Sequence, residues 1–270
     1  MKSGWKQLIP VYFVLLTAVM YLLTVIHERS RASVLQMNTC EGEDFRKQEL
    51  LPEVYEEIRK LSRSGGSFGE LLTTAMLNGD FHPKTVCTDR EPYYRYKRKE
   101  FDFLKSCYEA VWADLVYFPI PSGDISYENT WLDSRDYGGN RFHEGADLFG
   151  KVEIPGYYPV ISMTDGTVEQ IGWLPLGGYR IGIRSDHGGY FYYAHLSEYE
   201  RDFREGEQIE AGDILGYMGN TGYGAEGTVG QFPVHLHLGI YINTSSGEEL
   251  SVNPYWVLRA IHKKIINYSY

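Results

Sequence analysis

The chain has 270 residues, a formal net charge of −10 and a sequence pI near 5.3, and it is long enough for one large domain or two small ones. This acidic balance argues against a nucleic-acid-binding protein, because such proteins normally carry a basic patch. It also offers no attraction to anionic lipid head groups. The three cysteines form no CxxC pair, which argues against a structural zinc site built on paired cysteines.

The first predicted element is a transmembrane anchor. Residues 8–26 (LIPVYFVLLTAVMYLLTVI) carry no charge, and a helix of that length spans about 28 Å, close to the bilayer core of about 30 Å. Lys2 and Lys6 precede it, as expected if residues 1–7 form a cytoplasmic tail. Arg29 and Arg31 follow it, however, so the count of basic residues does not settle the orientation.

The alternative to an anchor is a signal peptide that is cleaved at Ser30-Arg31-Ala32, which would leave a secreted protein. Signal peptides usually have an apolar stretch of about 7–15 residues. The stretch here is longer, so the sequence favours a single-pass protein of the cell membrane. Both interpretations place the rest of the chain on the extracytoplasmic side.

A small helical module is predicted over residues 40–118. Leu50, Val54, Ile58 and Leu61 recur at spacings of three and four, which is typical of an amphipathic helix, and two further helical segments follow at 68–77 and 101–115. We expect this module to act as a stalk or to bind a protein partner. Its cysteines leave two alternatives open, a Cys87–Cys107 disulfide or three free thiols.

Glycine marks the next boundary, because 23 of the 29 glycines lie between residues 121 and 250. Such sequence with aromatic and β-branched runs predicts strands joined by tight turns. The fold class is therefore α+β, with a mainly antiparallel β domain over residues 120–250 after the helical module, and a C-terminal helix over 251–270. The predicted strands are residues 159–163, 167–173, 179–184, 190–195 and 234–242.

Two short motifs in this β domain carry metal-binding side chains. His143 and Asp147 stand four apart in HEGAD, and His235 and His237 form HLH on a predicted strand. The two HLH rings share a face about 7 Å apart, so one metal cannot easily bind both, and one of them is expected beside the metal-bound water. Nitrogen and oxygen ligands without cysteine indicate an open, water-activating zinc site and hence a hydrolase.

His195, at the end of an aromatic strand, is a fifth side chain expected in the same cleft. Two other metal folds with an HxH motif are excluded by spacing. Cupins place a glutamate a few residues further on, but residues 238–246 contain no acid. Metallo-β-lactamases require Asp-His directly downstream, where Leu238-Gly239 stands.

The ordered set of motifs resembles the M23 family of zinc peptidases, the LytM/lysostaphin-type endopeptidases of bacterial cell walls. The resemblance covers roughly residues 131–254 and includes RFHEGAD (141–147), YAHL (193–196), GDILGYMG (212–219) and VHLHL (234–238). It implies zinc bound by His143, Asp147 and His237, with His195 and His235 lining the catalytic water.

The resemblance also suggests roles for the two remaining histidines. We assign His235 to positioning or deprotonating the water and His195 to stabilising the oxyanion, and these roles can be exchanged, because a sequence does not show which ring nitrogen carries the proton. Glu144 is expected to be a surface acid. Tyr193 shares the face of His195 and is a candidate hydrogen-bond donor to the intermediate. Tyr223 and Phe232 are candidate walls of a narrow groove.

The predicted function is that of a membrane-anchored zinc metalloendopeptidase that hydrolyses peptide bonds in peptidoglycan stem peptides or cross-bridges. One alternative is a non-hydrolytic LytM-like scaffold or regulator of cell-wall hydrolases in division or sporulation. Such domains often lack one or more ligands, whereas this chain retains the whole set, which favours an enzyme. A peptidase for ordinary proteins is a third alternative.

Overall fold

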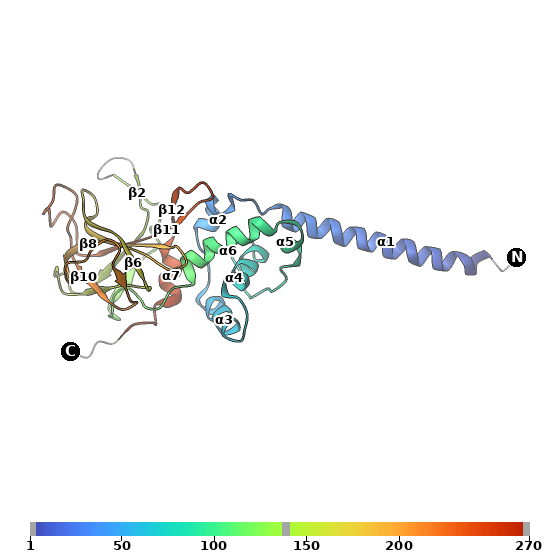
Figure 1. The fold of residues 1–270 in the computed structure, drawn as a ribbon, viewed down its shortest axis with the longest axis horizontal. Coiled ribbons are helices and arrows are strands. Elements are labelled where there is room, and N and C mark those ends of the chain that lie inside the picture. Colours follow the sequence, from blue (N-terminus) through green and yellow to red (C-terminus); the bar gives the residue numbers. More distant parts are fainter. Residues whose placement is uncertain (1–3, 137–140, 267–270) are drawn as a thin grey trace.

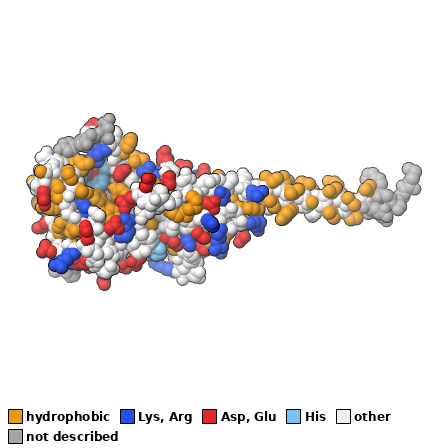
Figure 2. All heavy atoms as spheres, turned by 45° about the horizontal axis from the view of Figure 1, so that its top comes forward, with side chains coloured by type: hydrophobic (Ala, Val, Ile, Leu, Met, Phe, Trp, Pro, Cys, Tyr) orange, Lys and Arg blue, Asp and Glu red, His pale blue; other side chains and the backbone are white. Residues whose placement is uncertain are grey.

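The computed structural model describes residues 4–136 and 141–266, which form three parts along one axis (Figure 1). A long helix, α1 (Gly4–Ser33), extends away from the rest of the molecule. Within its segment from Leu8 to Ser33, an 18-residue window reaches a mean hydropathy of 2.3, so the helix is long and apolar enough to cross a membrane, a property that a signal sequence shares. On the face shown in Figure 2, apolar side chains lie along this helix as far as the end that joins the rest of the molecule.

The predicted helical module is present as a set of short helices. These are a 3₁₀ turn, η1 (Thr39–Glu41), and the α-helices α2 (Glu43–Arg46), α3 (Pro52–Arg63), α4 (Phe68–Asn78), α5 (Glu91–Tyr96) and α6 (Arg98–Trp112). Pro52 occupies the first position of α3, where its missing N–H costs nothing. Ser67 caps α4 by accepting a hydrogen bond from the Glu70 backbone N–H, so the chain breaks between the two helices where the sequence predicts it.

Of the two alternatives for the cysteines, the structure has the three free thiols. Cys107 on α6 is buried and interacts with Cys40, which is also buried, in the core of the helical module. Cys87 instead accepts a hydrogen bond from the side-chain amide of Asn78 at 3.2 Å. The spacing of cysteines along the chain does not show which of them meet, because helix packing decides that.

The β domain is built on one large antiparallel sheet. Its path runs β1-β4-β11-β8-β7-β6-β9, with β12 paired to β11, and with β10 joining β8 and β5. The strands are β1 (Ile125–Tyr127), β4 (Ala146–Gly150), β5 (Pro159–Ile161), β6 (Gly166–Leu174), β7 (Gly178–Arg184), β8 (Tyr190–Tyr199), β9 (Gln208–Ile209), β10 (Ile214–Met218), β11 (Leu236–Asn243) and β12 (Glu249–Val252), and a separate pair is formed by β2 (Ser134–Arg135) and β3 (Arg141–Phe142).

The α+β fold class is confirmed, and each of the five predicted strands is present with shifted ends. The remaining strands were not predicted, because most are only two to five residues long and too short to show an alternating pattern. Within the described residues, the C-terminal helix is shorter than the predicted range 251–270, of which residues 267–270 lie outside the described part. Residues 249–252 form β12, and α7 spans only Pro254–Ile261, where Asn253 Oδ1 caps it by accepting from the Tyr255 N–H at 3.0 Å.

The helical module packs on the β domain and does not stand apart from it as a stalk. Apolar residues of both parts belong to one continuous core. The Asn253 N–H donates to the Arg46 carbonyl at 2.8 Å, and the Arg46 Nε donates to the Ser251 carbonyl at 3.0 Å. In Figure 1, α7 and the inner end of α6 lie between the sheet and the other helices.

Trp112, at the end of α6, provides a stability test of this shared core. Its ring is fully buried against Tyr55, and its Nε1 donates to the buried Oε1 of Gln48 at 2.6 Å. We expect Trp112→Phe to lower the free energy of unfolding by at least about 1–3 kcal/mol, because the Gln48 acceptor is left buried without a partner. Urea unfolding followed by circular dichroism measures this change. Trp256→Phe, at a half-buried tryptophan, is the control, and equal losses in both variants would contradict the expectation.

Candidate metal centre and active site

The three predicted ligands meet where β4 lies beside β11. Asp147 and His237 are direct cross-strand neighbours in this pair, and His143 stands just before β4. Gly145 lets the chain turn closely over β11, since a Cβ at this position would lie 2.6 Å from His237 Cε1 and 2.5 Å from the Leu238 carbonyl oxygen. The glycine of HEGAD is therefore needed for the two motifs to approach each other.

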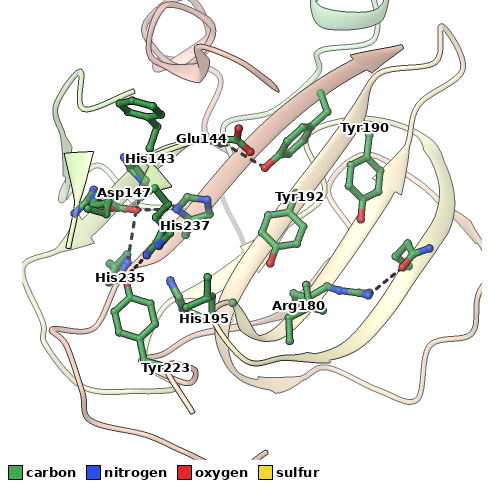
Figure 3. A pocket seen from close by; sticks show the side chains of 18 of the residues that line it. His143, Glu144, Asp147, Arg180, Tyr190, Tyr192, His195, Tyr223, His235 and His237 are labelled. Carbon is green, nitrogen blue, oxygen red and sulfur yellow. Dashed lines mark hydrogen bonds and ion pairs between the residues drawn. The ribbon is translucent and has the colours of Figure 1, made fainter. Parts of the chain in front are cut away.

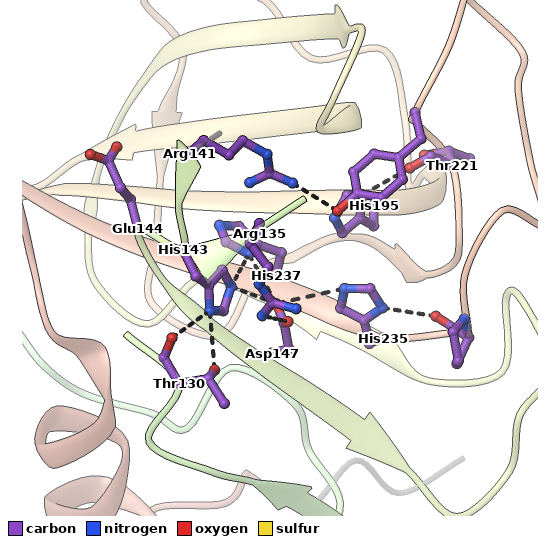
Figure 4. A network of polar contacts seen from close by, with 12 residues as sticks. Thr130, Arg135, Arg141, His143, Glu144, Asp147, His195, Thr221, His235 and His237 are labelled. Carbon is purple, nitrogen blue, oxygen red and sulfur yellow. Dashed lines mark hydrogen bonds and ion pairs between the residues drawn. The ribbon is translucent and has the colours of Figure 1, made fainter. Parts of the chain in front are cut away.

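The donor atoms of the ligands form a tight triangle. His143 Nε2, Asp147 Oδ1 and His237 Nδ1 are each 3.0 Å from the other two (Figure 4). On the far side of its ring, His143 Nδ1 donates to the Thr130 carbonyl at 3.0 Å, so Nε2 presents a lone pair to the carboxylate. Two acceptors facing each other at 3.0 Å are compatible only with a proton or a metal cation between them. This donor set fits zinc, which binds imidazole nitrogen and carboxylate oxygen.

Arg135, which no sequence motif marks, orients the carboxylate. Its Nη2 donates to Asp147 Oδ2 at 2.8 Å, which leaves Oδ1 for the histidines. Burial raises the pKa of Asp147, but the contacts with His143 and His237 outweigh burial and hold this pKa below its usual value. The carboxylate is thus charged at neutral pH. Neither Arg135 nor Thr130 stands in a motif, so only the folded chain identifies them.

His195 and His235 lie beside this triangle. The ring centroid of His195 is 4.8 Å from that of His235 and 5.9 Å from that of His237. His235 Nε2 is 3.6 Å from Asp147 Oδ1. The structure therefore brings all five predicted site residues together, and it places His235 and His237 on the same side, as the HxH spacing predicts.

Both additional histidines are held in the same tautomer. His195 Nδ1 donates to the Thr221 carbonyl and His235 Nδ1 donates to the Pro233 carbonyl, each at 2.8 Å. In the neutral rings, Nε2 therefore carries the lone pair, and both side chains act as proton acceptors toward the cleft.

The prediction for Tyr193 is wrong. His195 has a φ of 63°, in the left-handed region, and the pairing of β8 with β7 shifts register between Tyr179 and Ile181. This irregularity breaks the alternation, so Tyr193 points into the core, where its hydroxyl accepts from the Met163 N–H at 2.9 Å. Tyr192 lines the cleft instead.

Comparisons with known proteins agree with this geometry. The family model of Peptidase family M23 matches residues 141–254. A solved structure from Ruminococcus gnavus, provisionally assigned as the glycyl-glycine endopeptidase lytM, is 41% identical, with a TM-score of 0.72 over 83% of this chain and 92% of that one. This chain belongs to peptidase family M23. The Ruminococcus gnavus structure covers 83% of this chain, which is far more than the residues 141–254 that the family model matches. The similarity to that structure therefore extends into the helical module.

Two curated relatives carry more specific names. The L-Ala–D-Glu endopeptidase of Bacillus subtilis is 44% identical over 174 residues, which are 62% of this chain and 52% of that protein. The glycyl-glycine endopeptidase ALE-1 of Staphylococcus capitis is 36% identical over 88 residues, which are 32% of this chain and 22% of that protein. The matched segments span about half of the first relative and less than a quarter of the second.

Aromatic side chains form one wall of the M23 site. Phe232 lies against His195 with ring centroids 4.5 Å apart, and Tyr223 lies against Phe232 at 4.7 Å. Arg141 Nη2 donates to the Tyr223 hydroxyl at 2.8 Å. Tyr223 therefore lines the cleft as predicted, whereas Phe232 packs against His195 and Tyr223, and Glu144 is exposed at the rim (Figure 4).

The pKa values of His195 and His235 indicate how kcat/KM should depend on pH. Burial, with the neighbouring His235 and His237, lowers the pKa of His195 well below 6.5, and burial lowers the pKa of His235. A base acts in its neutral form, so a lowered pKa extends activity toward acid, and a metal cation nearby shifts the pKa in the same direction. We expect the acidic limb of kcat/KM to have its midpoint below pH 6.5, measured on a peptide substrate from about pH 4 to 8. A midpoint above 6.5 would contradict this.

Proposed function

We propose that this chain is a membrane-anchored, extracytoplasmic zinc endopeptidase that cleaves the L-Ala–D-Glu bond of peptidoglycan stem peptides. The observation that carries the proposal is the convergence of three ligand atoms with two acceptor histidines in one cleft. The 44% identity to the L-Ala–D-Glu endopeptidase of Bacillus subtilis supports this bond over a glycyl-glycine bond.

The contacts of α1 support an uncleaved anchor. Arg31 forms an ion pair with Asp89 at 2.8 Å, and Arg29 lies over the Tyr96 ring at 5.7 Å, so these arginines have structural partners and need not mark a cytoplasmic side. Ala32 and Leu35 are buried in the core. Cleavage at Ser30-Arg31-Ala32 would therefore cut a packed segment of the folded protein.

In the proposed reaction, zinc held by His143, Asp147 and His237 would polarise the peptide carbonyl and acidify a water molecule. His235 Nε2 accepts the proton of the attacking water, because this atom carries the lone pair of the ring and lies 3.6 Å from Asp147 Oδ1, beside the ligand triangle. The protonated His235 then donates to the leaving amine nitrogen.

His195 receives a different role from the one first assigned. Its Nδ1–H is bound to the Thr221 carbonyl and its Nε2 is an acceptor, so the neutral ring has no N–H to offer an oxyanion. Burial keeps this ring neutral. We therefore propose that His195 accepts the second hydrogen of the water and so orients its attack on the carbonyl.

Digestion of purified peptidoglycan by the full zinc-loaded chain tests the proposed function. The full chain is used because the helical module and the β domain share a core. We expect mass spectrometry to show new peptides that begin with the D-glutamyl residue. Binding of peptidoglycan without turnover would support the scaffold alternative, and degradation of casein at a similar rate would support a general peptidase.

A further inference from the structure

The active site opens into a groove that extends past the metal ligands. A cavity of about 730 Å³ covers the open face of the sheet from His143 to Glu249. The ring of Tyr192 lies 6.0 Å from that of His237, and the ring of Tyr190 follows at 6.4 Å (Figure 3). The groove floor is therefore aromatic and leads across β8 toward β7 and β6.

Two glycines allow the tyrosine side chains of this floor to lie close to the sheet backbone. Gly182 on β7 and Gly239 on β11 are the cross-strand neighbours of Tyr192. A Cβ at Gly182 would lie 1.9 Å from the Tyr190 hydroxyl oxygen, and a Cβ at Gly239 would lie 2.7 Å from Cε2 of Tyr241. The rings of Tyr190 and Tyr241 therefore lie over the backbone of Gly182 and Gly239, respectively. This arrangement leaves space above the rings for an extended ligand.

Arg180 of β7 lies in this floor with an uncompensated charge (Figure 3). Only 8% of its surface is exposed. Its Nη2 donates to the neutral Oε1 of Gln170 at 3.0 Å, and within the described part of the chain its buried Nη1 has no hydrogen-bond partner. A buried guanidinium without a carboxylate partner is costly, so it marks a place where an anion is expected.

The carboxylates of Glu169 and Glu249, at this end of the groove, already form ion pairs with Arg184. Arg184 Nη2 donates to Glu169 Oε1 at 2.6 Å and to Glu249 Oε1 at 2.8 Å. At the opposite end, Arg135 is paired with Asp147. Arg180 therefore differs from both of these arginines, because its side-chain partner is a neutral amide.

We infer that Arg180 binds a carboxylate of the substrate and selects stem peptides over glycine bridges. This inference rests on the proposed function. Arg180 stands two strands from His237, a distance of about 10 Å at about 4.8 Å per strand, which an extended peptide of about three residues covers. A glutamyl residue uses one of its two carboxyl groups in the chain and keeps the other free, whereas a glycyl-glycine bridge offers no carboxylate. The anion comes either from this glutamyl residue or from a residue that follows it.

Synthetic stem peptides test the inference. Three substrates are compared, one with all carboxylates free, one amidated at the glutamyl residue and one amidated at the next residue. We expect the wild-type chain to cleave one of the amides with a kcat/KM about ten- to a hundredfold below that of the free acid, as for loss of a charge-assisted hydrogen bond. Arg180→Gln should abolish this preference, and Arg180→Lys should restore part of it. The amide whose penalty disappears in Arg180→Gln identifies the carboxylate.

Lys151→Gln is the matched control, because it makes the same change in net charge at an exposed lysine paired with Asp124. It should leave the preference intact. If Arg180→Gln keeps the wild-type ratio between acid and amides, the inference fails even though cleavage continues.

Binding separates this failure from a failure of the proposed function. The free-acid peptide and both amides are titrated by calorimetry onto the metal-free full chain and onto its Arg180→Gln variant. Tighter binding of the acid by wild type alone supports the carboxylate site even if no peptide is cleaved. Equal affinities for acid and amides in wild type would overturn it.

Discussion

Replacing His237 by alanine is expected to abolish zinc binding and peptide cleavage together. The substitution removes one of three donor atoms and leaves His143 and Asp147, which is too few for a stable site. Zinc content measured by mass spectrometry should fall from about one per chain in the wild type to near zero, and kcat/KM should fall to background.

His187→Ala is the control for this result, because His187 lies in the turn between β7 and β8 and pairs with Asp114 away from the site. It should retain zinc and activity. A His237→Ala protein that keeps one zinc would show that the metal is bound elsewhere and would contradict the ligand assignment.

The second large effect is expected for His235→Ala, which should keep the zinc and lose cleavage. Its Nε2 is the proposed proton acceptor and lies outside the ligand triangle, so removal should lower kcat by about 10²–10⁴-fold with little change in metal content. The same measurements on His195→Ala should also show retained zinc and a lower kcat, since His195 orients the water without binding the metal.

Tyr193→Phe is the control for both variants, since its hydroxyl points into the core and not into the cleft. Unchanged peptidoglycan hydrolysis by His235→Ala would show that the proposed role of His235 is wrong. Loss of zinc in His195→Ala would instead make His195 part of the metal site.

Much of the secondary structure could be predicted because the signals for it are local. The uncharged residues 8–26 and the spacing of Leu50, Val54 and Ile58 each identify a helix without knowledge of its neighbours. The long strands β6, β7, β8 and β11 were found for the same reason, whereas a strand such as β4 has too few residues to show a pattern.

The ligands could also be predicted, but their support could not. His143, Asp147 and His237 stand in recognisable motifs, while Thr130 and Arg135 come from segments without a pattern. Tyr193 shows the limit of an alternation argument, because a single left-handed residue at His195 reverses the side to which its neighbours point.

By itself, therefore, the sequence determined the candidate membrane segment, the α+β class and the identity of the metal-binding side chains, since each depends on residues close together in the chain or on a distinctive motif. Only the tertiary structure decided what depends on pairing between distant segments. The pairing of β4 with β11 closes the ligand triangle, the packing of α6 and α7 joins the helical module to the sheet, and the position of Arg180 on β7 places an uncompensated charge in the groove. These features arise from contacts between residues far apart in sequence, and no local pattern encodes them.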